Sequence, residues 1–329
     1  MLPRSLAVAA VLLAFPTPIL QAQTYDAVGT RAAGMGGAFV AVADDASAAY
    51  WNPAGFAAGS FFSLVLDRNA SKTPPKAAAG GSQSAVLLAL GAPPLGFSYY
   101  RLRTTVSSPV GGALGGTPSG SPAVRFETLT THHAGLTLVQ SIAPGVAVGA
   151  TLKLVRGLAG AEVRAGADPN DPLSEGSDLP RKAGTRFDAD VGVMATAGIL
   201  KAGLAMRNLT EPSFKTPGDL GPLQLQRQAR AGLSVTPVPG WIVAADLDLL
   251  ETRGMRGPRR GFATGVEGRL ARKAFVRGGL NLNTAGDRAP AVSGGFSYAA
   301  TASLLLEGRL TRGPDDAERG WGIAARFGF

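Results

Sequence analysis

The sequence predicts an all-β protein: a 14-stranded antiparallel transmembrane β-barrel preceded by an N-terminal hatch segment. Three observations lead to this fold class. The chain begins with an apolar leader, apolar and polar residues alternate with a period of two from residue 61 onward, and long and short connections follow one another. The 329 residues include no cysteine, which excludes disulfide bonds and cysteine-ligated metals.

Residues 1–22 have the three parts of a secretory signal peptide. "MLPR" supplies a positive charge, "SLAVAAVLLAF" an apolar core and "PTPILQA" a helix-breaking end with a small last residue. This stretch is too short for a spanning helix. The mature chain is therefore expected to leave the cytoplasm. Its net charge of +9 is carried by scattered lysines and arginines, which argues against nucleic acid and favours outer-membrane lipid and lipopolysaccharide as partners.

Residues 23–60 combine closely spaced glycines with a short helix that ends abruptly. Asp44 or Asp45 is placed to cap a helix over residues 46–51. Pro53 forces Asn52 out of the helical region and ends that helix. The glycines allow the backbone to pack closely against a barrel wall; they include Gly34, Gly36 and Gly37.

Residues 61–329 contain the strand pattern of the barrel itself. Most of the predicted strands have about nine to eleven residues, the length that a tilted strand needs to cross a bilayer. The predicted ranges are 61–68, 83–91, 95–104, 132–142, 146–157, 186–197, 200–208, 227–235, 241–250, 261–270, 275–283, 291–298, 301–310 and 320–329.

The predicted connections alternate between long and short. Residues 69–82, 105–131 and 158–185 are long, whereas "APP" (92–94) and "APG" (143–145) are short. This sorting is typical of outer-membrane barrels, which have short periplasmic turns and longer extracellular loops. A soluble β-sandwich, the alternative that alternation alone allows, has no reason to sort its loops in this way.

The two faces of the predicted strands differ in charge. One face is rich in Leu, Val, Ala and Phe, as lipid requires. The other face carries charges of both signs, which predicts a lumen lined by cross-strand ion pairs rather than a filter of one sign. These charged residues are Lys153, Lys201, Arg207, Arg230, Arg269, Arg277, Arg309 and Arg326, and Asp67, Asp188, Asp190, Asp246, Asp248, Glu267 and Glu307.

The last predicted strand, "WGIAARFGF", ends the chain on Phe329. Trp321 and Phe329 fall where the aromatic girdles of outer-membrane barrels lie. A terminal strand that ends on phenylalanine also resembles the signal that the outer-membrane assembly machinery reads. The sequence therefore predicts this machinery as a partner.

The N-terminal segment resembles a known family. "GTRAAGMGGAFVAVADDASAAYWNPAGFA" is similar to the hatch of the FadL/TodX family of outer-membrane transporters for hydrophobic compounds, which precedes and plugs a 14-stranded barrel. The resemblance implies a bacterial outer-membrane location, a hatch role for residues 23–60 and a ligand pocket beside them. The implied hatch positions are Gly34, Gly36, Gly37, Asn52, Pro53 and Ala54, and the implied ligand-binding positions are Met35, Phe39 and Phe56.

Two further functions compete with passive uptake of fatty-acid-like or hydrocarbon compounds. "GLAMRNLTEPSF" (203–214) resembles a strand-to-loop step of the related PorV-like barrels, which implies a component of a protein secretion or assembly machinery with a secretion-system protein as partner. A structural barrel without cargo is the third interpretation. The chain departs from the transporters in its polar 158–185 loop, which puts an apolar capture groove in doubt.

The sequence gives no sign of an enzyme, a cofactor or a metal. His132 and His133 are adjacent on a strand edge and point to opposite faces, so they cannot share a metal, and we expect a solvated pair. No serine, histidine and acid are placed for hydrolysis. The acids of the 158–185 loop lack calcium-loop spacing, so we expect solvated side chains there; they are Asp168, Asp171, Glu175 and Asp178.

Overall fold

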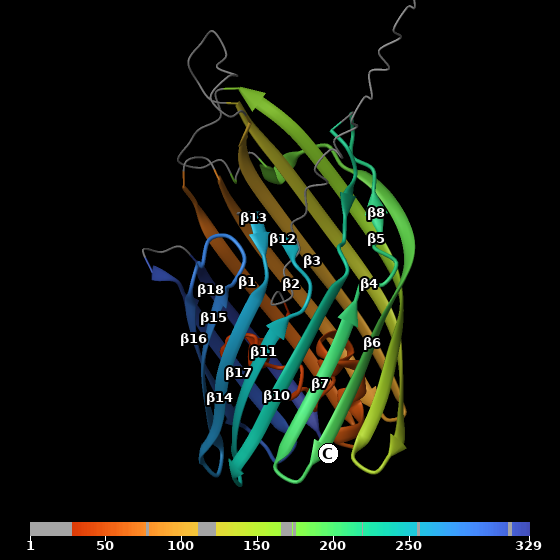
Figure 1. Ribbon diagram of the computed structural model, residues 1–329, viewed down its shortest axis with the longest axis vertical. Helices are drawn as coiled ribbons and strands as arrows, with labels where there is room; N and C mark the ends of the chain where they lie inside the picture. Colours follow the sequence, from red (N-terminus) through yellow and green to blue (C-terminus); the bar gives the residue numbers. More distant parts are fainter. Residues whose placement is uncertain are drawn as a thin grey trace, which may run out of the picture.

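The structure, a computed structural model, describes residues 28–76, 79–110, 123–165, 173, 176–218, 220–254, 257–314 and 318–329. Fourteen strands from these residues close into one antiparallel barrel (Figure 1). They are β1 (Ser63–Lys76), β2 (Ala79–Ala92), β3 (Leu95–Val110), β4 (Ala123–Ala143), β5 (Val146–Ala165), β6 (Lys182–Ala197), β7 (Leu200–Arg207), β10 (Gln228–Val238), β11 (Trp241–Asp248), β14 (Gly261–Ala271), β15 (Ala274–Asn283), β16 (Ala291–Ala299), β17 (Leu304–Arg312) and β18 (Arg319–Gly328).

The first and last strands close the barrel. β1 pairs with β2 on one side and with β18 on the other, from Ser63 opposite Gly328 to Lys72 opposite Arg319. Beyond this ladder, Phe62 and Phe329 exchange two backbone hydrogen bonds and stack their rings with centroids 5.1 Å apart. Closure leaves no unpaired sheet edge, which is the condition for strands to cross a bilayer. The predicted 14-stranded antiparallel barrel is therefore confirmed.

Several strands are longer than predicted, and one predicted loop is wrong. β1 and β2 are separated by residues 77 and 78 alone, so the long connection expected over 69–82 does not exist. β3, β4 and β5 likewise extend far into the expected loops 105–131 and 158–185. In these extensions polar residues interrupt the outward apolar series, so the period of two weakens while the hydrogen-bonded ladder continues.

The other connections keep their sorting by length. The short turns lie together at one end of the barrel, and the longer connections lie at the opposite end (Figure 1). Two of the longer connections contain small hairpins that the sequence did not predict. They are β8 (Ser213–Phe214) with β9 (Leu223–Gln224), and β12 (Thr252–Gly254) with β13 (Gly257–Arg259).

The wall separates an apolar outer face from a charged lumen. Leu88, Leu154 and Phe296 are examples of outward, exposed side chains. Most of the predicted lumen charges are buried, but Arg269 is exposed and Lys201 is half-buried, at strand ends beside short turns. None of the helices in the described part of the chain is both long and apolar enough to span a membrane.

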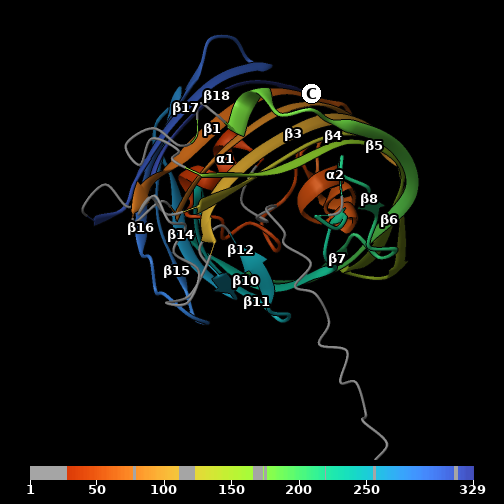
Figure 2. The ribbon, with the colours of Figure 1, turned by 90° about the horizontal axis from the view of Figure 1, so that it is seen from above.

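Residues 28–60, here called the lumenal segment, lie inside the barrel. They form α1 (Thr30–Gly34), α2 (Ala48–Trp51) and the 3-10 helix η2 (Pro53–Ala58). Seen from above, α1 and α2 lie within the ring of strands (Figure 2). The segment fills the half of the barrel near the short turns (Figure 1). The predicted signal peptide, residues 1–22, lies outside the described residues.

Candidate functional site

Glycines of the barrel wall make room for the lumenal segment. At eight wall positions a Cβ atom would fall less than 3.0 Å from an atom of this segment, closer than real Cβ atoms come. We call these residues the wall glycines; they are Gly91, Gly96, Gly149, Gly192, Gly203, Gly265, Gly279 and Gly322. They come from eight different strands, so the backbone of the wall contacts the segment over much of its circumference.

Asn52 fastens the segment to β6. Its Nδ2 atom donates to the carbonyl oxygens of Val40, 2.9 Å away, and of Val193 on β6, 3.1 Å away. Its Oδ1 atom accepts the N–H of Ala54 at 3.1 Å, so the side chain caps η2 as well. The amide rests on Gly192 and Gly203, where any side chain would displace it.

Wall carboxylates accept the backbone N–H groups of the segment. Asp246 accepts both Phe39 and Val40 through Oδ2, each at 2.8 Å. Asp67 accepts Thr30 at 2.6 Å. A carboxylate that bonds backbone N–H groups in a buried site is a strong, charge-assisted contact. These two acids therefore hold the segment, a role that the sequence did not predict for them.

A closed ring of ion pairs joins the segment to four strands. Arg31 of α1 contacts Glu267 on β14 through two bonds of 2.7 and 2.9 Å, and contacts Asp45 at 3.0 Å. From Glu267 the contacts continue around the wall and return to Asp45. The members of this ionic ring, in order, are Arg31, Glu267, Arg277, Glu307, Arg326 and Asp45. Positive and negative charges alternate around it, so each buried charge has partners of opposite sign.

An aromatic and basic cluster holds α2 on the opposite side. The guanidinium of Arg207 lies 3.5 Å from the ring centroid of Tyr50, which packs edge-on against Tyr100. His133 stacks on Tyr100 with centroids 4.2 Å apart and is fully buried. The expectation of a solvated histidine is therefore wrong for His133. His132 does point outward, where its Nδ1 atom lies 2.8 Å from the hydroxyl of Tyr99.

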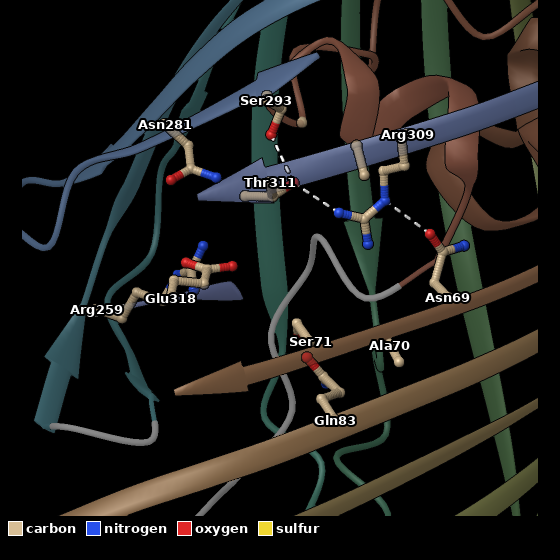
Figure 3. Close-up of a pocket in the computed structure, with 13 residues that line it drawn as sticks. Asn69, Ala70, Ser71, Gln83, Arg259, Asn281, Ser293, Arg309, Thr311 and Glu318 are labelled. Atoms are coloured by element: carbon tan, nitrogen blue, oxygen red, sulfur yellow. Dashed lines mark hydrogen bonds between the residues drawn. The ribbon is translucent and has the colours of Figure 1, made fainter. Parts of the chain in front are cut away.

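A polar pocket remains open beside α1. It is lined by Ala33, Gly36, Gly37, Asn69, Ala70, Ser71, Gln83, Arg259, Asn281, Ser293, Arg309, Thr311 and Glu318. Figure 3 shows amide, hydroxyl and guanidinium groups converging on it, with Arg309 donating to Asn69 and Thr311 at 2.8 and 2.7 Å. Its volume of about 30 Å³ accommodates about two water molecules. In this conformation the pocket is too small for a cargo molecule.

The three residues that the resemblance implied as ligand-binding are buried between the segment and the wall. Met35 and Phe39 are 0% exposed and Phe56 is 3% exposed. Phe56 lies over the wall glycines Gly91 and Gly96, and Phe39 packs against Trp51 at 5.7 Å between ring centroids. None of the three lines the polar pocket. The structure thus brings them together with the implied hatch residues.

The other half of the lumen is filled from the end with the longer connections. Phe214, Leu223 and Leu225 are buried against strands β4 and β5, where Gly157 makes space for Phe214. These apolar loop residues therefore face inward rather than forming an outer groove. Among the described residues no group of acids and histidines is placed to hold a metal, and Asp168, Asp171 and Glu175 lie outside the described residues.

Solved structures similar to this barrel are transporters and channels. The toluene transporter TbuX of Ralstonia pickettii has a TM-score of 0.63 at 14% identity, covering 93% of this chain and 99% of that chain. The CymD monoaromatic hydrocarbon channel has a TM-score of 0.65 at 14% identity, covering 94% and 99%. A FadL homologue of Pseudomonas aeruginosa has a TM-score of 0.61 at 12% identity, covering 92% and 98%.

These similarities confirm the expected FadL/TodX likeness at the level of the fold. The first two neighbours are described as a transporter and a channel, and the third as a FadL homologue. A family model described as "F plasmid transfer operon, TraF, protein" matches residues 123–248, which is less than half of the chain. No curated protein matches the sequence. The class that the fold defines is thus the FadL-like 14-stranded barrel.

Proposed function

We propose that this protein is an outer-membrane barrel of a Gram-negative bacterium that takes up hydrophobic small molecules by passive diffusion, with residues 23–60 as its hatch. The fold and the apolar outer face support the membrane location. The observation that carries the proposal is the lumenal segment itself, which occupies the barrel lumen and is tied to the wall by Asn52, Asp67, Asp246 and the ionic ring. Uptake then requires this segment to move.

The polar pocket indicates which hydrophobic molecules suit the barrel. Its lining of amides, hydroxyls and guanidinium groups fits a carboxylate or hydroxyl group better than a hydrocarbon. Met35, Phe39 and Phe56 would supply apolar surface once the segment shifts. We therefore propose that the cargo is an amphiphile with a polar end, such as a fatty-acid-like molecule, rather than a bare hydrocarbon.

Uptake measurements test this function. Cells that lack other routes should accumulate labelled long-chain fatty acid faster when they express the protein, and the rate should not depend on an energised membrane. Phe56→Ala should lower uptake without changing the amount of barrel in the membrane, whereas exposed Phe61→Ala should leave it unchanged. Equal accumulation with and without the protein for fatty acid and toluene alike would refute the proposal.

A second candidate is a component of a secretion, transfer or assembly machinery. The TraF match over β4 to β11 favours it, because the description of that family names a plasmid transfer operon. Such a role predicts a protein partner on the longer connections, and crosslinking from Lys215, exposed beside β8, would capture it in intact cells. A barrel that neither transports cargo nor captures a partner would be structural.

The proposal also includes the assembly machinery as a partner through Phe329. This residue is 72% exposed and continues the closing strand pair through its stacking with Phe62. An exposed terminal aromatic ring is available to a binding protein before closure is complete. Phe329→Ala should reduce the yield of folded barrel in cells, while refolding of the purified variant in detergent should stay close to that of the native protein.

A further inference from the structure

An apolar groove crosses the outer wall where β1 to β6 lie side by side. It has a volume of about 620 Å³. The small residues Ala134 and Gly135 contribute to its lining together with larger apolar side chains, among them Phe97, Leu154 and Phe187, which are more than half exposed. In a bilayer such an outward apolar groove faces the acyl chains of the lipids.

A row of basic residues borders this groove on one side. The strand register places Arg101 opposite His132, and His132 opposite Arg156. Each stands two positions along its own strand from a groove residue, respectively Tyr99, Ala134 and Leu154. Side chains two apart on a strand share a face, so the row points outward like the groove. Neighbouring strands are about 4.8 Å apart, so the row spans about 10 Å.

The outer face of these strands carries an excess of positive charge. Arg68 and Lys72 on β1 are exposed and face outward as well. Among the described residues of β1 to β6, Glu162 is the one acid on the outer face, and Arg164 contacts it through two bonds of 3.0 Å. The remaining acids of these strands are buried on the lumen side; they are Asp67, Glu127, Asp188 and Asp190.

The height of the row matches the headgroup level of one leaflet. Arg156 lies ten residues beyond Val146, the first residue of β5 after a short turn. At about 3.3 Å per residue and a tilt of about 40°, this distance rises about 25 Å, the height of the apolar band of a membrane barrel. The row therefore lies at the bilayer boundary farther from the short turns.

We propose that the groove and the basic row bind a phosphorylated lipid of the outer leaflet, with an acyl chain in the groove and a phosphate between Arg101 and Arg156. The inference rests on the orientation given by the proposed function, in which the short turns face the periplasm. Arginine suits this ligand because its guanidinium donates two parallel hydrogen bonds to phosphate. Tyr99 holds His132 between the two arginines through its hydroxyl.

Native mass spectrometry of the detergent-solubilised protein tests the phosphate. Lipid A and dephosphorylated lipid A are added separately, and we expect at least tenfold tighter binding of the phosphorylated form. R101Q/R156Q should abolish this preference. R272Q/K273Q, which removes the same charge from the exposed turn between β14 and β15, should retain it. Heat-modifiable migration on gels verifies that each variant is folded, and Arg156→Gln alone serves if the double variant misfolds.

A second variant tests the groove. Ala134→Phe fills the groove without changing charge, so it should weaken both lipids by a similar factor. Equal binding of the two lipids by the native protein, or an unchanged phosphate preference in R101Q/R156Q, would overturn the proposal. Because this experiment measures lipid binding and not transport, it tests the lipid site even if the barrel takes up no cargo.

Discussion

At the scale of single residues, Asn52 connects backbone groups of the lumenal segment with the barrel wall. It bonds Val40 and Ala54 within the lumenal segment and Val193 on the wall. Asn52→Ala should weaken docking of the segment by about 1–3 kcal/mol, since buried donors and acceptors lose their partners. We expect more rapid entry of small polar solutes in cells and an unchanged heat-modifiable barrel. Unchanged entry would show that Asn52 does not secure the segment.

Arg31 is the residue of α1 whose loss should release the segment most strongly. Removing one member of a buried ion pair costs about 3–5 kcal/mol, because the remaining charges stay buried. Arg31→Met should therefore open the lumen to hydrophilic antibiotics more than Asn52→Ala does, and Glu267→Gln in the same chain should restore part of the closure. Arg164→Gln, which breaks the outer pair with Glu162, is the matched control and should change nothing. Resistance equal to that of the native protein in Arg31→Met would contradict the ionic ring.

The sequence could predict some of these residues and not others. Asn52 and Pro53 could be predicted as hatch residues because Pro53 forces Asn52 out of the helical region and ends the helix. Asp67 and Asp246 were predicted as lumen charges. Their partners were not predicted, because they are backbone N–H groups, which every residue type except proline carries. The wall glycines were not predicted, because the sequence alone does not distinguish a strand glycine that faces lipid from one that faces another backbone. Glycines on the face that carries the lumen charges were the available signal.

At the scale of elements, the docking of the lumenal segment should depend on pH through Asp45. Burial, the largest influence, favours the neutral form of this acid. The charges of Arg326 and Arg31 and the hydrogen bonds of Ser47 outweigh it, so the pKa of Asp45 lies below its usual value. A lowered pKa means that the ionised acid stabilises docking above the pH at which the free acid titrates, about 4, and that this contribution is lost as the pH falls through the lowered pKa.

Single-channel recording checks this dependence. Conductance should be low at pH 7 and rise in strongly acidic solution, and Asp45→Asn should be conductive already at pH 7 with a smaller response to acid. A native conductance that is independent of pH down to pH 2 would show that Asp45 does not contribute to docking. The ends of β3, β4 and β5 could not be predicted from the sequence. In the parts of these strands farther from the short turns, the regular apolar alternation that indicates a membrane strand weakens.

A glycine pair tests how the segment fits the wall. Gly279 and Gly278 are neighbours on β15, but a Cβ on Gly279 would overlap Met35 and Gly36, whereas one on Gly278 has only a side-chain atom of Val266 at 3.9 Å. Gly279→Ala should therefore destabilise docking by about 1–3 kcal/mol through overpacking, and Gly278→Ala should not. The measurement is protease sensitivity of the segment in the purified barrel. Equal cleavage of both variants would mean that the wall does not fix the segment.

At the scale of the whole molecule, the proposed function depends on the orientation of the barrel in the membrane, which determines the end that receives cargo. The short turns and the C-terminus lie at the end where the lumenal segment is docked (Figure 1). The alternation of connection lengths after β2 was predictable from the sequence, because turn residues interrupt the apolar pattern at regular intervals, whereas the short connection between β1 and β2 was not. Which parts of the longer connections fold into the lumen was not, since Phe214 and Leu223 have the composition of any apolar loop.

Introduced cysteines measure this orientation directly, since the native chain contains none to interfere. Lys215→Cys lies in a long connection and Arg272→Cys in a short turn, and both positions are exposed. A maleimide that cannot cross the outer membrane should label Lys215→Cys on intact cells and label Arg272→Cys only after lysis. The reverse pattern would place the short turns outside the cell. The lumenal segment would then close the external mouth, and the basic row on the outer wall would face the inner leaflet.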